Sequence, residues 1–282
     1  MSFETSLILS LFPGIDMLGM GFEAEGFCVV RSPDLIFGGD IRNFHAVPGR
    51  FDGVIGGPPC QDFSKARRSA PTGYGLEMLG EFVRVVLEAA PAWWLLENVD
   101  RVPDVAVDGY SVQRFDLNAK ECGLRQSRLR HFQFGSKTGV VVIPRREKMP
   151  GESRIEAACL ATEGRKKDRR SWGDFCELQG LPRDFSLPGM TTEARYRAVG
   201  NGVAIPVARV VARAIRDTAP DGGGCQVTDV RLCACGCGRV LEGRGDQRAA
   251  TVACRKRLEK RRKQAKAKPT YEFGYELDGE HL

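Results

Sequence analysis

A short motif rich in glycine and proline presents one cysteine directly after an apolar run, and it constrains the fold more than any other part of the chain. The run at residues 51–55 is followed by Gly56-Gly57-Pro58-Pro59-Cys60. The glycines let the backbone approach a ligand closely, and the prolines fix φ. A stiff turn therefore holds the thiol of Cys60, which is typical of a nucleophile. A βα loop with a buried thiol fits the same motif, so other residues must decide.

A second apolar run, at residues 92–96, ends in Glu97-Asn98. In an open parallel sheet, ligands bind at the carboxyl ends of the strands, so we expect Cys60 and Glu97 to face one crevice. Residues 6–143 alternate short apolar runs with helix-like stretches, among them residues 80–90 with one apolar face. This alternation predicts an α/β fold with a doubly wound sheet.

The residues around Cys60 and Glu97 resemble the DNA (cytosine-5) methyltransferase family. The family signatures Pro-Cys-Gln and Glu-Asn-Val stand here as Pro59-Cys60-Gln61 and Glu97-Asn98-Val99. Further family motifs follow in the family's order: Leu11-Phe12-Pro13-Gly14-Ile15, Gly39-Asp40-Ile41, Gln126-Ser127-Arg128-Leu129-Arg130, Glu177-Leu178-Gln179-Gly180-Leu181-Pro182 and Gly200-Asn201-Gly202-Val203. The resemblance implies a Rossmann-like, S-adenosylmethionine-dependent methyltransferase sheet with a small recognition region and a Cys-rich basic C-terminal appendage.

The resemblance also implies a reaction, DNA (cytosine-5-)-methyltransferase chemistry on a cytosine flipped out of duplex DNA. Cys60 would add to C6 of the base, and we expect its place near a helix amino terminus to favour the thiolate. Glu97 would act at N3 with a pKa raised by burial against residues such as Trp93 and Trp94. Arg128 would stabilise the developing charge. The implied substrate-binding residues are Gln61, Ser64, Gln126 and Arg130.

The cofactor implied by the resemblance is S-adenosylmethionine, with Phe12, Gly14, Asp34, Asp40, Pro59 and Asn201 as its binding residues. Asp34 lies about 20 residues beyond the Gly14 turn, a spacing that places a carboxylate on a ribose hydroxyl. Asp40 is assigned to the adenine amino group, although a helix cap is the alternative reading. Asp16-Met17 stand where the family usually has two glycines, so the resemblance does not determine how the first turn approaches the ligand.

Composition divides the chain into segments. We expect a catalytic and cofactor-binding lobe at residues 1–135, a short basic target-recognition region at 136–170, and a return to the catalytic lobe at 171–216. Residues 217–224 have linker composition, residues 225–268 combine cysteines with a basic helix, and residues 269–282 form an acidic tail.

The C-terminal segment carries two further features. Cys233, Cys235, Cys237 and Cys254 suggest a zinc knuckle similar to small zinc-ribbon tails, although their spacing is irregular; the alternative is a flexible tail with free thiols. Residues 255–268 carry nine Lys or Arg against one Glu, whereas the net charge of the whole chain is +6. This basic segment suggests contact with a polyanion such as DNA, with a solvated helix as the alternative.

No run in the sequence approaches the roughly 20 apolar residues of a transmembrane helix, so we expect no membrane partner. We expect a cytoplasmic monomer without disulfides, with duplex DNA as its partner. Two other functions stay open: an RNA (tRNA) cytosine-5 methyltransferase, and a catalytically idle DNA-binding relative. The recognition sequence and the purpose, whether restriction-modification, phage self-protection or regulation of DNA methylation, are not specified by these motifs.

Overall fold

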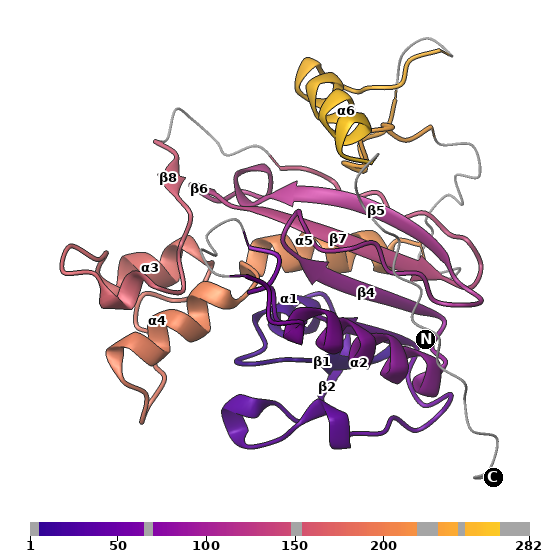
Figure 1. The fold of residues 1–282 in the computed structure, drawn as a ribbon. Coiled ribbons are helices and arrows are strands. Elements are labelled where there is room, and N and C mark those ends of the chain that lie inside the picture. Colours follow the sequence, from indigo (N-terminus) through magenta and orange to yellow (C-terminus); the bar gives the residue numbers. More distant parts are fainter. Residues whose placement is uncertain (1–5, 65–69, 148–153, 219–230, 242–245, 266–282) are drawn as a thin grey trace.

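The centre of the computed structural model is a six-stranded sheet with the strand order β2-β1-β3-β4-β7-β5 (Figure 1). The structure describes residues 6–64, 70–147, 154–218, 231–241 and 246–265. The strands of the sheet are β1 (Leu7–Leu11), β2 (Cys28–Arg31), β3 (Gly53–Gly56), β4 (Trp93–Asn98), β5 (Ser111–Asn118) and β7 (Leu129–Ser136). The first four are parallel, while β7 runs antiparallel to both β4 and β5.

Helices cover both faces of the sheet, which confirms the predicted α/β class. Helices α1 (Met17–Glu23) and α5 (Ile205–Arg216) lie on one face, and α2 (Tyr74–Ala89) lies on the other. The alternation of side chains along β4 explains this arrangement, since Leu95 joins the core beneath α1 and α5 whereas Leu96 joins the core beneath α2. Pro206 stands in the first turn of α5, where proline is tolerated.

A second lobe sits beside the carboxyl ends of the parallel strands. It contains α3 (Trp172–Leu178), α4 (Thr192–Asn201), the short 3₁₀ helix η4 (Glu163–Arg165), and the paired strands β6 (Gln126–Ser127) and β8 (Glu156–Ala157). Its core combines Cys159 with Phe175, Tyr196 and Val199. Cys159 belongs to the predicted recognition region and the other three to the predicted return segment, so packing does not follow a boundary at residue 170.

The remaining short helices are η1 (Leu35–Phe37), η2 (Ile41–Asn43) and η3 (Ala119–Glu121). The tail contributes residues 231–241 and 246–265, including helix α6 (Val252–Ala265), which lies over β5 in Figure 1. The tail's basic helix is therefore observed. The predicted linker lies mostly, and the predicted acidic tail entirely, outside the described residues.

One stretch of the described chain, Thr192–Arg216, has the length and apolar composition of a membrane-crossing helix. It consists of α4 and α5, which are separated by residues 202–204, and 61% of its most apolar window is buried inside the protein. Packing of α5 against α1 and the sheet accounts for this apolar composition.

Candidate active site

A pocket opens at the carboxyl ends of β1, β3 and β4, and both Cys60 and Glu97 line it, as expected from their positions after β3 and in β4. The register of the sheet explains the meeting, because Gly56 at the end of β3 pairs with Leu96 next to Glu97. Residues of the sequence-derived set that line the pocket are Phe12, Gly14, Asp34, Asp40, Pro59, Cys60, Gln61, Glu97, Arg130 and Asn201. Those that do not are Ser64, Gln126 and Arg128.

Hydrogen bonds fix the loop that carries Cys60. Asn98 at the end of β4 donates from Nδ2 to the carbonyl of Pro58 over 2.9 Å. The backbone N–H of Phe63 donates to the carbonyl of Cys60 over 3.0 Å, which closes a turn. The carboxylate of Asp62 accepts from the N–H of Gly75 in the first turn of α2. The loop is thus attached to β4 on one side and to α2 on the other.

The expected helix directly after Cys60 is not observed. The described residues that follow Cys60 form a turn, and α2 begins only at Tyr74. Burial raises the pKa of the Cys60 thiol, and the charge of Glu97 adds to this effect, while Arg130 and Arg128 oppose it. The expectation that a helix amino terminus would favour the thiolate was therefore wrong for the described part of the loop, since residues 61–64 form no helix whose dipole could lower the pKa.

Glu97 is buried, and among the described residues Arg130 on β7 forms an ion pair with it, with Arg130 Nε 2.8 Å from Glu97 Oε1. Burial raises the pKa of Glu97, which confirms that prediction, and Arg130 counteracts the rise. The two tryptophans named in the prediction pack elsewhere: Trp93 lies against Phe22, Phe27 and Phe134, and Trp94 lies against Phe82 and Tyr110.

Gly57 leaves the space that the Glu97 carboxyl occupies. A Cβ at position 57 would lie 3.1 Å from Oε2 of Glu97, closer than an ordinary van der Waals contact. The second glycine of the motif is thus explained by close approach of the loop to the carboxyl group.

The buried side chains of Arg128 and Gln126 form hydrogen bonds to backbone groups inside the protein. The guanidinium of Arg128 donates to the carbonyls of Cys159, Gly200 and Gly202 over 2.5, 2.6 and 3.1 Å. Burial lowers the pKa of Arg128 to about 9. Gln126 donates to the carbonyl of Leu178 and accepts from the N–H of Cys159. The arginine that meets Glu97 in the pocket is Arg130, so the geometry differs from the sequence-derived assignment of Arg128.

The turn after β1 has an unusual backbone. Phe12, Gly14 and Asp16 all have positive φ angles, of 53°, 54° and 57°. Such left-handed conformations are unfavourable for residues other than glycine and gather at ligand sites. Asp34 anchors this turn, since its Oδ2 accepts from the N–H of Gly14 and its Oδ1 accepts from the N–H of Ile36, each over 2.9 Å.

Asp16 replaces a family glycine and is accommodated by its neighbours. Its Oδ1 accepts from the hydroxyl of Ser10 and from the N–H of Gly19, which caps α1. Its Oδ2 lies 2.7 Å from Nε of Arg31. A Cβ at position 19 would lie only 2.0 Å from Asp16 Oδ2, so Gly19 makes room for the aspartate. Sequence reasoning missed this pair, although the signal of an Asp cap three residues before a glycine was present.

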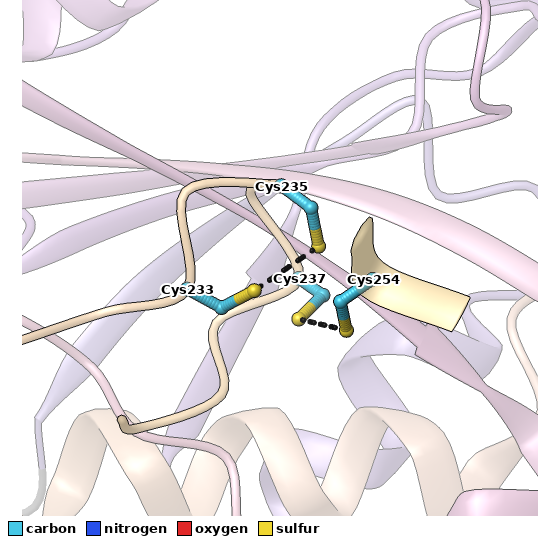
Figure 2. Close-up of side chains that lie close together, drawn as sticks. All are labelled: Cys233, Cys235, Cys237 and Cys254. Carbon is cyan, nitrogen blue, oxygen red and sulfur yellow. Dashed lines mark hydrogen bonds between the residues drawn. The ribbon is translucent and has the colours of Figure 1, made fainter. Parts of the chain in front are cut away.

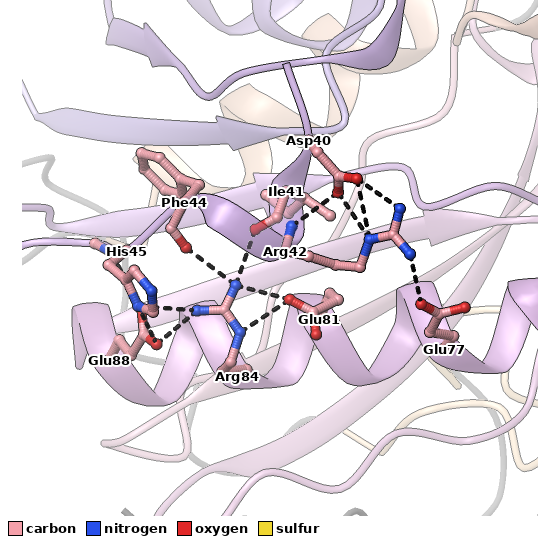
Figure 3. Close-up of polar contacts among 10 residues, drawn as sticks. Asp40, Ile41, Arg42, Phe44, His45, Glu77, Glu81, Arg84 and Glu88 are labelled. Atoms are coloured by element: carbon pink, nitrogen blue, oxygen red, sulfur yellow. Dashed lines mark hydrogen bonds and ion pairs between the residues drawn. The ribbon is translucent and has the colours of Figure 1, made fainter. Parts of the chain in front are cut away.

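Asp40 caps η2, with its Oδ1 accepting from the N–H of Arg42, so the capping alternative is observed together with its place in the pocket (Figure 3). Hydrogen bonding from the Arg42 side chain lowers the pKa of Asp40, and Arg42 reaches Glu77 on α2. Arg84 on α2 donates to the carbonyls of Ile41 and Phe44. Helix α2 thus holds the segment that presents Asp40.

The four tail cysteines converge outside this pocket. The sulfur atoms of Cys233, Cys235, Cys237 and Cys254 all lie within 4.8 Å of one another, and all four residues are buried (Figure 2). Such a cluster could hold a metal ion.

Comparisons with known proteins identify the family to which the chain is similar. The sequence model of the family described as C-5 cytosine-specific DNA methylase matches residues 7–169 and 171–217. Type II methyltransferase M.HgiDI of Herpetosiphon aurantiacus is 37% identical over 99 residues, or 31% of this chain and 32% of that protein. Type II methyltransferase M.NgoPII of Neisseria gonorrhoeae is 30% identical over 161 residues, or 45% of this chain and 47% of that protein. The chain thus spans 32% and 47% of the length of these two relatives.

Solved structures with low sequence identity share the fold. The Entamoeba histolytica methyltransferase EhMeth is 12% identical with a TM-score of 0.58, covering 76% of this chain and 99% of that one. A mutant of Spodoptera frugiperda DNMT2 is 12% identical with a TM-score of 0.53, covering 75% of this chain and 99% of that one.

Proposed function

The chain belongs to the C-5 cytosine-specific DNA methylase family, and we propose that it transfers a methyl group from S-adenosylmethionine to C5 of a cytosine in DNA. The observation that carries this proposal is the common pocket of a fixed thiol, Cys60, and a buried carboxyl group, Glu97, with its cationic partner Arg130. Because the thiol and the carboxyl group face one cavity, both can reach a single planar base. The base has to leave the DNA stack to enter the pocket.

Cys60 is the proposed nucleophile. As a thiolate it adds to C6 of the cytosine, and this covalent bond breaks the aromaticity that otherwise makes C5 a poor nucleophile. Burial raises the pKa of Cys60, so attack on C6 requires that the thiol first lose its proton. The positive charges of Arg130 and Arg128 lower the pKa of Cys60 and favour the thiolate, whereas the charge of Glu97 raises that pKa.

Glu97 is the proposed partner of N3. Burial raises the pKa of Glu97 above that of an ordinary carboxyl, which favours the protonated form that would donate to N3 as negative charge develops on the ring. Arg130 lies against the same carboxyl group and is our candidate for stabilising the oxygen side of the base. We assign this role to Arg130 rather than Arg128, whose guanidinium is engaged by three backbone carbonyls.

The residues present fit S-adenosylmethionine. The left-handed turn at Phe12 and Gly14 brings backbone close to the pocket without side-chain obstruction at Gly14, and Asp34 and Asp40 place carboxylates on its rim. Asp34 would meet the ribose, Asp40 the adenine amino group, and Asn201 the methionine portion. When bound, S-adenosylmethionine supplies the methyl group on a positively charged sulfur. None of the four clustered cysteines is among the described residues that line the pocket.

The cycle closes when the C5 proton passes to a water molecule and the electron pair of that C–H bond forms the C5–C6 double bond. The Cys60–C6 bond breaks in this elimination, which restores the aromatic ring and the free thiolate. Glu97 recovers the N3 proton in the same step. The products are 5-methylcytosine and S-adenosylhomocysteine, and no further reactant is needed.

Incubation with tritiated S-adenosylmethionine and either duplex DNA or tRNA tests the proposal. We expect incorporation into DNA, and a covalent adduct with a duplex that contains 5-fluorocytosine, because fluorine cannot leave as a proton does. Cys60→Ser should abolish both signals, whereas Cys28→Ser, which changes an exposed thiol on β2, should retain them. Incorporation into tRNA alone, or full activity of Cys60→Ser, would refute the proposal.

A separate measurement tests the cofactor residues. Asp34→Asn should weaken S-adenosylmethionine binding in calorimetry, because hydrogen bonds to a charged acceptor are worth about 1.5–3 kcal/mol. Binding of S-adenosylmethionine that equals the wild type would remove Asp34 from the proposed cofactor set while leaving Cys60 and Glu97 untouched.

A further inference from the structure

The four buried cysteines of the tail form a closed cluster that the methylation chemistry does not use. Three come from the loop at residues 233–237, and Cys254 comes from the first turn of α6 (Figure 2). We propose that these four thiolates bind one structural Zn²⁺, and that the ion fastens α6 to the outer strand of the catalytic sheet.

The spacing of the sulfur atoms suits zinc. Four thiolates at about 2.3 Å from a tetrahedral Zn²⁺ lie about 3.8 Å from one another. The Cys233 and Cys235 sulfurs are 3.4 Å apart, and the Cys237 and Cys254 sulfurs are 3.7 Å apart. A disulfide would require about 2.05 Å, so these pairs are not bonded to each other. A site with four thiolate ligands and no open position is structural rather than catalytic.

The surroundings supply donors for negatively charged sulfur. The N–H of Ala250 points to Cys233 Sγ over 3.3 Å, the hydroxyl of Thr251 points to Cys254 Sγ over 3.1 Å, and Arg239 reaches the same sulfur. Four thiolates and one Zn²⁺ leave two net negative charges, which such donors and a guanidinium offset. The backbone is shaped for the cluster as well, since Gly236 and Gly238 have φ angles of 72° and 70°.

The module has almost no other core. In the described tail, the buried members of the hydrophobic cluster are the four cysteines and Leu241, with Ala249, Ala250 and Leu258 packed at the side. Four neighbouring thiols and one leucine bury too little apolar surface to offset the conformational entropy of ordering the loop. Metal binding is the usual source of the missing free energy in segments of this size.

The cysteine loop and α6 both contact the catalytic domain, so a metal ion that joins them would also hold α6 against the sheet. Arg239, between the third and fourth cysteines, forms an ion pair with Glu121 of η3. Arg257 on α6 lies 3.2 Å from Oδ2 of Asp116 on β5. Gly238 sits so close to Phe115 of β5 that a Cβ there would lie 2.7 Å from the phenylalanine Cβ. Loop and helix therefore meet the sheet through separate contacts, and the four thiolates are what joins loop to helix.

Metal analysis of the full-length protein, purified without chelators and under reducing conditions, tests the site. We expect about one zinc ion per chain, and cobalt substitution should produce the visible spectrum of a tetrahedral tetrathiolate centre. Cys235→Ser should lose most of the bound metal, whereas Cys176→Ser, which changes a buried thiol of α3, should retain it. Cobalt spectra that lack thiolate charge-transfer bands, or equal metal in both variants, would overturn the site.

Hydrogen exchange tests the fastening. Removal of metal from the wild-type protein should raise exchange in residues 231–241 and 246–258 and in the adjoining β5, while β1 and β3 should keep their protection. Arg257→Ala should raise exchange in α6 with the metal content unchanged. If the metal-free protein retained full protection in β5 and α6, the ion would not fasten the helix and the proposal would fail. Because these readouts need no methyl transfer, they are independent of the proposed enzyme function.

Discussion

The Nε of Arg130 lies 2.8 Å from Oε1 of Glu97, so the buried carboxyl group of the pocket has its cationic partner on the antiparallel strand β7. Glu97 and Arg130 come from neighbouring strands, and both side chains are largely excluded from water. Arg130 lowers the pKa of Glu97 and so partly offsets the rise that burial causes. The same pairing places a guanidinium beside the proposed reacting base.

Arg130→Ala should destabilise the protein by about 3–5 kcal/mol, because a buried charge loses its partner. The folded pKa of Glu97 is already raised, so its contribution to stability is present at low pH and is lost as pH rises through that pKa. Removing Arg130 raises the pKa further, and the deficit against the wild type should therefore grow from acid to neutral pH. Urea unfolding across this range measures it. The double variant with Glu97→Gln should lose the pH dependence; a deficit independent of pH would contradict the pairing.

Arg128→Lys should reduce thermal stability, since the single ammonium nitrogen of lysine cannot reach the three carbonyls that Nη1 and Nη2 of Arg128 contact, and each unsatisfied buried group costs about 1–3 kcal/mol. Arg125→Lys is the matched control, because Arg125 is half exposed and lies 3.8 Å from its acidic partner Glu177. Calorimetric melting compares the two. If Arg128→Lys melted with the wild type yet had no activity, Arg128 would act on the substrate rather than on the fold.

Much of the fold follows from sequence patterns, because buried strands and amphipathic helices carry strong signals. The apolar runs at β3 and β4 and the apolar face of α2 are examples. Helix α4 was not predicted, because it is short and mostly polar; its capping Thr191 was the local signal available. The antiparallel insertion of β7 next to β4 depends on long-range pairing, which no local pattern shows.

The candidate site was predictable where a motif fixes a strand end, as for Cys60 and Glu97. The partners of the two arginines were not predictable, because the chain changes direction between β6 and β7. Alternation along an extended stretch places Arg128 and Arg130 on one side, but Arg128 lies between β6 and β7 while Arg130 lies within β7. The two guanidinium groups therefore reach different partners, backbone carbonyls for one and Glu97 for the other.

Alkylation of Cys60 by iodoacetamide should be slow at neutral pH and rise with increasing pH, because burial and the charge of Glu97 raise the thiol pKa. Glu97→Gln removes that charge, so its alkylation profile should move to lower pH. Peptide mapping follows the reaction, with exposed Cys28 in the same sample as the standard for reagent activity. A profile that stays in place or moves to higher pH would show that Glu97 does not act on the thiol.

Gly19→Ala should destabilise the wild-type protein despite the helix propensity of alanine, since the added Cβ would lie 2.0 Å from Asp16 Oδ2. Overpacking of this kind typically costs about 1–3 kcal/mol. In an Asp16→Gly background the clash is absent, and the same change should be neutral or stabilising. Chemical denaturation of the four proteins completes the cycle; additive effects would mean that the two positions are independent.

Deletion of residues 225–282 should lower DNA affinity and flatten its salt dependence, because log K falls with log salt by about 0.9 per phosphate neutralised. If the basic helix contacts three or four phosphates, the slope should be shallower by ~3. Anisotropy titrations at several salt concentrations give the slope. Arg257 already faces Asp116, so its single replacement should change the slope less than deletion does. Identical slopes for full-length and truncated protein would show that the helix faces solvent.

Arg146 donates both to the backbone carbonyl of Asp116 in β5 and to the carbonyl of Cys237 in the cysteine-rich loop. Because β5 is the last strand of the sheet, this arginine covers an edge at which another chain could add a strand. The cysteine loop steadies the arginine that shields the edge. If the loop holds the proposed zinc ion, molecules made without the ion should expose a pairing edge and should be the first to self-associate.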